Sequence, residues 1–253
     1  MMTKKQLHFL LTIASIFLCQ CSEEIEPNQY TYTAQFAESN IKIDGILNED
    51  AWQNSETIAL KHNSSAGVVH DSSTMTWVRT CYDRQNLYIA YECHDSDIWS
   101  EFSNRDDHLW EKDAVEIFID TDGILNTYYE IQVSPKNVVF DAHLEIPTKT
   151  DDAEIIAFNV GGIQTAVTID GSLNVHTDTD KKWTVEIAIP IAGLIEEKAS
   201  VESGSWRINF FRMNHDIAGE RPELGWSPTL GDFHIPAKFG VLKFNKGNHL
   251  ETE

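Results

Sequence analysis

The sequence predicts an all-β protein, a two-sheet antiparallel β-sandwich folded as a single domain. Short runs in which apolar and polar residues alternate recur along the chain, and turn residues separate them. Helical periodicity is nearly absent, and no low-complexity linker divides the 253 residues, which are enough for one sizeable core. Many short strands in a chain of this length are typical of two sheets packed face to face.

The clearest alternation lies in residues 87–93, 114–120 and 183–189, where every second residue is a large apolar one. A short helix is expected over residues 49–54 and a turn over residues 191–194. The expected strands cover residues 30–36, 57–61, 74–82, 87–93, 114–120, 128–134, 138–144, 163–169, 183–189, 207–213 and 240–244.

The N-terminus is typical of a bacterial lipoprotein signal. Two lysines precede an apolar run over residues 9–18, which is too short to span a bilayer comfortably and is soon followed by acidic residues. Leu18 lies three positions before Cys21, which makes Cys21 the expected lipidation site and residues 1–20 the expected signal peptide. Cys19 is the second choice for the lipid, and an ordinary cleaved signal is the alternative.

Residues 21–29 are expected to form an acidic tether, followed by the domain over residues 30–246 and a tail over residues 247–253. The Ser-Glu-Glu at residues 22–24 resembles the surface-export tag of Bacteroidetes lipoproteins. We therefore expect a lipid anchor in the cell envelope, at the outer membrane, with the domain exposed at the cell surface.

The charge of the chain restricts its ligands. The formal net charge is −21, from 19 Lys and Arg against 40 Asp and Glu, and loss of the two lysines in the signal would bring it to −23. Such a surface repels nucleic acid and anionic headgroups and suits a neutral or cationic ligand, or divalent cations. No nucleic-acid partner is expected.

The two cysteines inside the domain flank an expected hairpin that turns at residues 83–86. In its register Cys81 faces the region of Tyr88 and Cys93 faces the region of Thr76, so no disulfide between them is expected. No CxxC or HxH spacing indicates a zinc site.

A series of motifs carries a resemblance that covers about residues 41–244. In this order the motifs resemble the carbohydrate-binding module family 9 domain. The resemblance implies a β-sandwich with a sugar slot and, often, bound calcium. The motifs are residues 43–52, 87–95, 109–120, 128–135, 183–190 and 206–210, then Trp226 and residues 239–240.

A pyranose has apolar C–H faces, which aromatic rings cover, and a polar rim of hydroxyls, which carboxylates and amides bind. The resemblance implies that Trp110 and Trp226 stack on the two faces of one sugar ring and that Glu116 accepts a hydroxyl. Trp110 could instead pack at the start of its strand.

Two residues depart from the pattern of the family's sugar binders. Gln132 stands where an Arg is usual, and Glu223 where an Asn is usual. Gln can donate and accept hydrogen bonds but lacks a charged fork. The slot is therefore either adapted to another sugar or lost, and an arginine nearby in sequence could compensate. The candidates are Arg105, Arg212 and Arg221.

Other tryptophans have different expected roles. Trp99 lies in a polar loop and could be a further platform or a lid over the edge of the core. Those expected in the core are Trp52, Trp77, Trp183 and Trp206.

Asp120 and Asp122 lie in a segment that resembles half of a calcium loop. The remaining ligands of such a loop are missing, so a hairpin turn rich in Asp and Gly is the alternative. Calcium is the expected cofactor, with a structural role. Further oxygen donors in the sequence are Asp44, Asp95 and Asp97.

No catalytic motif of the hydrolase, P-loop or dinucleotide type is present, so the chain is expected to bind a saccharide without catalysis, in glycan capture or utilisation. One alternative is a structural partner in a surface glycan-uptake complex with no active slot. The other is a haem-binding electron-transfer domain on a similar sandwich. Its candidate axial ligands are Met75, Met213, His108, His215 and His234.

Overall fold

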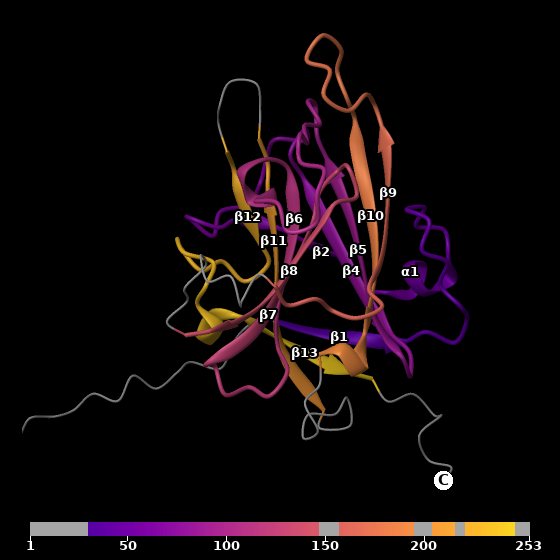
Figure 1. Cartoon of the computed structure of the whole chain (residues 1–253), viewed down its shortest axis with the longest axis vertical. Helices are drawn as coiled ribbons and strands as arrows, with labels where there is room; N and C mark the ends of the chain where they lie inside the picture. The colour runs from indigo at the N-terminus through magenta and orange to yellow at the C-terminus, as the bar shows by residue number, and fades with distance from the viewer. Residues whose placement is uncertain (1–29, 147–156, 195–203, 216–220, 246–253) are drawn as a thin grey trace, which may run out of the picture.

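A computed structural model describes residues 30–146, 157–194, 204–215 and 221–245, and it places them in two β-layers around a shared core (Figure 1). The expected signal peptide, Cys21, the acidic tether and the C-terminal tail lie outside the described residues. No helix in the described ranges is long and apolar enough to cross a membrane.

The first layer has the strand order β8-β7-β6-β11-β13-β1, and the second continues as β1-β4-β5-β10-β9. Three short strands complete the sheet: β12 pairs with β11 and β3, and β2 pairs with β4. The strands are β1 (Thr31–Phe36), β2 (Ile58–Ala59), β3 (Lys61–His62), β4 (Thr76–Tyr82), β5 (Asn86–His94), β6 (Ala114–Asp120), β7 (Thr127–Val133), β8 (Val139–Glu145), β9 (Gln164–Asp170), β10 (Lys182–Pro190), β11 (Ser205–Met213), β12 (Glu223–Gly225) and β13 (Gly240–Phe244).

Strand β1 joins the two layers. Its residues 31–34 pair with β13 and residues 35–36 pair with β4, and both pairings are parallel. The expectation of a purely antiparallel sandwich is therefore wrong at this strand. Parallel neighbours need a long connection in place of a tight turn, and most of the domain lies between β1 and β13 in sequence. All other strand pairs among the described residues are antiparallel.

The alternation in the sequence explains the core between the layers. In β5, β6 and β10 the odd-numbered residues point inward and are fully buried. Trp183 and Trp206 lie in the same core, as expected. The inward residues of these strands are Leu87, Ile89, Tyr91, Cys93, Val115, Ile117, Ile119, Trp183, Val185, Ile187 and Ile189.

The outer face of the second layer, formed by β4, β5, β10 and β9, is partly covered by residues 41–52. This segment ends in the helix α1 (Asp50–Asn54), which lies beyond the second layer, away from the first (Figure 1). Trp52 is fully buried there, as expected for a core residue, and its Nε1 donates to Glu186 Oε1 at 2.7 Å. The second carboxylate oxygen accepts the backbone N–H of Asp44 at 2.9 Å and of Gly45 at 2.7 Å.

The expected register of the β4–β5 hairpin is confirmed. Cys81 pairs with Tyr88 and Cys93 pairs with Thr76, and both thiols are buried and free. Trp77 was expected in the core, and this is wrong. It points to the outer face of β4 and is partly exposed, because its position in the strand alternates with that of the inward-facing Val78.

Candidate functional site

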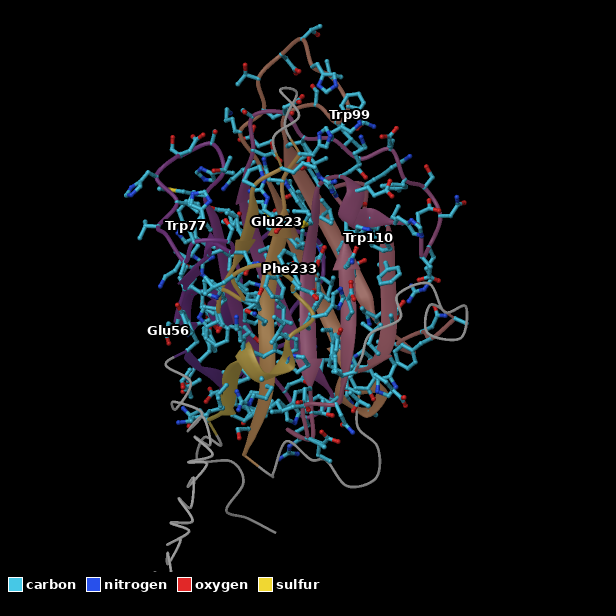
Figure 2. All side chains as sticks on the ribbon, turned by 90° about the vertical axis from the view of Figure 1, so that its left-hand side faces the viewer. Glu56, Trp77, Trp99, Trp110, Glu223 and Phe233 are labelled. Atoms are coloured by element: carbon cyan, nitrogen blue, oxygen red, sulfur yellow. The ribbon has the colours of Figure 1, made fainter. Side chains whose placement is uncertain are left out.

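The candidate site lies on the outer face of the first layer, around β6, β7, β8 and β11, which we call the β6 face. Glu116 on β6 pairs laterally with Gln132 on β7 and with Phe211 on β11. Residues paired directly across a ladder share a face, so these three side chains lie in one row. Glu130 is two residues before Gln132 and belongs to the same face. Figure 2 looks onto this face and shows Trp110 on its right-hand side, with Phe233 and Glu223 nearer the middle.

The floor of the site consists of buried polar side chains. Glu116 is 2% exposed, Glu130 5% and Gln132 1%. The amide Nε2 of Gln132 donates to Glu130 Oε1 at 2.5 Å. Glu116 Oε1 and Gln132 Oε1 are buried and have no hydrogen-bond partner in the described part of the chain. A buried acceptor without a partner is costly, so these two oxygens are suited to a donor that arrives with a ligand.

Burial controls the charge of this floor. It raises the pKa of Glu116 well above its usual range, and the negative charges of Glu130 and Glu223 raise it further, while Arg221 lowers it. Burial also raises the pKa of Glu130 to about 7, against a lowering by the hydrogen bond from Gln132. Both carboxyl groups therefore keep their protons to higher pH than an exposed glutamate does, and when protonated they can donate as well as accept hydrogen bonds.

Aromatic side chains flank the polar floor on both sides. Next to Glu116, Phe233 stacks on Phe211, with ring centroids 4.1 Å apart and an interplanar angle of 4°. Next to Gln132, Trp110 meets Phe140 edge to face at 5.3 Å. Both Trp110 and Phe233 are partly exposed, whereas the two rings beneath them are buried. The arrangement offers apolar ring surface on either side of unpaired acceptors.

Trp110 is held in place from two directions. It belongs to a short 3-10 helix (Leu109–Glu111) directly before β6, and His108 stacks on it at 4.5 Å with an angle of 21°. The guanidinium of Arg221 donates to the backbone carbonyl of Trp110. Because Arg221 also lowers the pKa of Glu116, it is the arginine that reaches this site.

The other two arginines considered as compensation lie elsewhere. Arg105 pairs with Asp141, and Arg212 is fully buried on the core side of β11, where it pairs with Asp95 at 2.8 Å. Glu223 is exposed on β12 and lies beside Met213, so it belongs to the rim of the site and not to its floor.

The structure contradicts the proposed role of Trp226 as a stacking platform. Its side chain is 7% exposed and belongs to the core, where it packs against Phe210 at 5.6 Å and Tyr30 at 6.1 Å. A Cβ placed on Gly240 would come within 2.2 Å of the indole, which shows how closely the backbone approaches it. The physical reason is the strand β12, absent from the expected elements, which carries the chain back along β11 and turns Trp226 inward.

The two aspartates proposed as metal ligands stabilise a turn after β6. Asp120 is 1% exposed and accepts backbone N–H groups from Asp122, Gly123 and Leu125, while Asp122 accepts the N–H of Ile124 at 2.8 Å. Burial raises the pKa of Asp120 to about 6. These hydrogen bonds are those of the hairpin turn expected as the alternative, and calcium binding by Asp120 and Asp122 stays a prediction. The described residues contain no group of three or more His, Cys, Asp or Glu that could hold a metal.

Three residues of the site were not expected from the sequence. Glu130 could have been found, since it lies two positions before Gln132 on the same strand and therefore on the same face. Phe211 is similar, because its position alternates with Phe210 in the core. Phe233 has no such signal, since it lies in an irregular segment before the 3-10 helix Pro236–Lys238.

The family comparison agrees with this geometry. The family model described as carbohydrate family 9 binding domain-like matches residues 43–246, which is most of the chain. The chain belongs to this family. The match begins in the segment that covers the second layer and ends just beyond β13, so the family 9 domain includes nearly all of the described fold.

Two curated relatives are similar in sequence to this family 9 domain. An extracellular protein of Arthroderma benhamiae is 30% identical over 178 residues, which cover 67% of this chain and 78% of the relative. Endo-1,4-β-xylanase A of Thermotoga neapolitana is 27% identical over 207 residues, which cover 81% of this chain but only 17% of the xylanase. The similarity thus spans a small part of that enzyme.

Solved structures show the same fold. A carbohydrate-binding module of family 9 from Caldicellulosiruptor kristjanssonii, in complex with cellotriose, has a TM-score of 0.61 and 18% identity, covering 88% of this chain and 98% of that one. A family 9 module from the same organism, in complex with glucose, has a TM-score of 0.60 and 17% identity, covering 88% of this chain and 100% of that one.

Proposed function

We propose that this family 9 domain binds a neutral saccharide on the β6 face and catalyses no reaction. The sugar ring would lie over Glu116, Glu130 and Gln132, with Trp110 on one side and Phe233 on the other. Phe233 takes the role that the sequence suggested for Trp226.

One observation carries the proposal. Glu116 Oε1 and Gln132 Oε1 are buried acceptors without a partner, between two aromatic pairs on the same face. A sugar supplies what this arrangement needs, since its hydroxyls donate to the acceptors and its C–H faces cover the rings. The solved complexes of a family 9 module with cellotriose and glucose support this ligand class.

The placement of the carboxyl groups argues against glycoside hydrolysis. Glycosidases use two carboxyl groups on opposite sides of the bond that is cleaved. Here Glu116 and Glu130 lie on adjacent strands of one sheet and point in the same direction, so both would contact the same side of a sugar.

We further propose that a lipid anchor at Cys21 places the domain at the cell envelope. With Cys21 lipidated, the acidic tether of residues 21–29 would hold the domain away from the membrane, at the outer membrane and facing outward. There it would capture saccharides for other glycan-uptake proteins. Conversion of Cys21 to Ser should release the protein from membranes without changing its sugar affinity.

A glycan array tests the binding proposal. The purified chain should retain one or more neutral oligosaccharides, and Trp110→Ala should weaken that binding about tenfold, the contribution expected of one aromatic contact. Trp99→Ala is the matched control, because the Trp99 ring stacks on His176 at 3.9 Å and lies well above Trp110 in Figure 2. Equal losses in both variants, or no retained glycan, would contradict the proposal.

A further inference from the structure

A hollow with polar and apolar walls lies on the outer face of the second layer. It has a volume of about 300 Å³ and lies between the turn at residues 45–48 and the strands β5, β10 and β9. Among its lining residues are Asn48, Glu92, Thr168, Asp170 and Lys182. None of them belongs to the β6 face, so this hollow is separate from the site described above.

The hollow is built into the fold. Thr168 and Thr184, which pair across β9 and β10, both donate their hydroxyl groups to the carbonyl of Gly45, at 2.8 Å and 2.6 Å. Gly45 has a φ of +81°, and a Cβ at this position would lie 2.9 Å from the backbone of β9. The turn can therefore approach the strands this closely only with glycine. The wall and floor of the hollow are fixed before any ligand arrives.

The charges in the hollow are already balanced. Lys182 Nζ lies 2.7 Å from Glu92 Oε2, and Lys181 Nζ lies 3.1 Å from Asp170 Oδ1. Lys182 and Glu92 are partly exposed, and Lys181 and Asp170 are exposed. All four keep spare donors or acceptors, since an ammonium has three donors and a carboxylate several lone pairs. A balanced set of this kind favours an uncharged ligand rich in hydroxyls over an ion.

An aromatic ring lies at the end of the same row of side chains. Trp77 on β4 pairs directly with Glu92 on the neighbouring strand β5. Glu92 pairs with Thr184 on β10, and Thr184 pairs with Thr168 on β9. Three strand spacings of about 4.8 Å make this row about 14 Å long. The ring of Trp77 is partly exposed and is held edge to face by His94 at 4.8 Å. Figure 2 shows Trp77 at the left, on the side opposite Trp110.

We propose that this row is a second saccharide-binding site, in which Trp77 stacks on one sugar unit and the hollow beside Lys182 and Asp170 binds the hydroxyls of the next. The combination of a partly exposed indole with convergent amide, hydroxyl and paired charged groups is that of a site for a short neutral oligosaccharide. Two sites on opposite faces would let one chain hold two saccharide segments at once.

Fluorine NMR of the full chain labelled with 5-fluorotryptophan tests the proposal. The signals of Trp77 and Trp110 are assigned with Trp77→Phe and Trp110→Phe, and glucose, cellotriose and xylotriose are then titrated to about 10 mM, tenfold above the dissociation constant of a weak site. The Trp77 signal should shift and saturate with at least one trisaccharide. The same titration curve should be obtained in Trp110→Ala.

A matched pair of lysine variants locates the ligand. Lys182→Gln should weaken the titration seen at Trp77 about tenfold, whereas Lys243→Gln, at an exposed position on β13 and outside the lining of the hollow, should leave it unchanged. A Trp77 signal that does not move with any of the three sugars, or that responds equally in both lysine variants, overturns the proposal. The Trp110 signal reports separately on the β6 face, so failure of that site is distinguished from failure of this one.

Discussion

The two outer faces of the sandwich each bury a glutamate, and they treat it in opposite ways. Glu186 on the outer face of the second layer is fully buried, and its two oxygens accept three hydrogen bonds from Trp52, Asp44 and Gly45. Glu116 on the β6 face is equally buried, but one of its oxygens has no partner in the described residues. The carboxylate of Glu186 holds part of the chain in place, whereas that of Glu116 keeps a free acceptor, which we propose a ligand uses.

The same difference shows in the electrostatics. Burial raises the pKa of Glu186, but its hydrogen bonds from Asp44, Trp52 and Gly45 lower it. The pKa of Glu116 rises well above its usual range, because neighbouring negative charges add to its burial. Two carboxyl groups that are equally buried therefore differ in their hydrogen bonds and in how far their pKa is raised.

The largest expected difference in stability is between two tryptophans, one in the core and one at the rim of the β6 face. Trp226→Ala should destabilise the fold by about 3–5 kcal/mol, because it opens a cavity in the core beside Phe210. Trp110→Ala should cost about 1 kcal/mol, since its ring is partly exposed at the rim. Urea unfolding followed by circular dichroism measures both. Similar losses in the two variants would show that Trp110 is also a core residue.

The pH dependence of stability tests the floor itself. In the folded protein the pKa of Glu130 is about 7, above its ordinary value of 4.5. Between pH 4.5 and pH 7 the folded state therefore keeps a proton that the unfolded chain releases. The stability that this proton confers is complete below pH 4.5 and is lost as the pH rises through 7, an effect on the order of 3 kcal/mol.

Urea midpoints at pH 5 and pH 8 measure this effect. The wild type should lose stability between the two, and Glu130→Gln, which cannot titrate, should lose less. Glu145→Gln, at an exposed position on the neighbouring strand β8, is the control and should behave as the wild type. A slope in Glu130→Gln equal to that of the wild type would contradict the assigned cause.

Substitution of the two outward-facing glutamates, Glu186 and Glu116, should change the free energy of unfolding by smaller and unequal amounts. Glu186→Gln should destabilise by about 2 kcal/mol, because its amide group would face backbone and indole donors that need an acceptor. Glu116→Gln should leave the free energy of unfolding unchanged or raise it slightly. Thermal unfolding of the two variants side by side compares the faces directly, and an equal loss in both would remove the distinction between them.

Most of the fold could be predicted from the sequence, because alternation is a local signal. The bounds of β6 and β13 match the expected ranges, and the register of the β4–β5 hairpin follows from its turn. The parallel pairing of β1 could not be predicted, since it depends on two strands distant in sequence. Strand β12 has only three residues, which is too short for alternation to show.

The candidate site was predicted in part, from the resemblance to family 9. The resemblance gave Trp110, Glu116 and Gln132, and alternation along β6 and β7 explains why Glu116 and Gln132 share the outer face. The error at Trp226 arose in a segment rich in Gly and Pro, where no periodicity says which side chains point inward. Phe233 was missed because its contact with Phe211 joins residues that only the tertiary fold brings together.

We propose that the free acceptors of the β6 face bind a sugar hydroxyl. Calorimetric titration of the wild type and of Glu116→Met, which leaves no carboxyl or amide oxygen at this position, with the oligosaccharide best retained on the glycan array tests this proposal. We predict an affinity at least about tenfold lower in the variant, the loss of one hydrogen bond to a buried acceptor, with no decrease in melting temperature. Equal affinities in the two proteins would contradict the account.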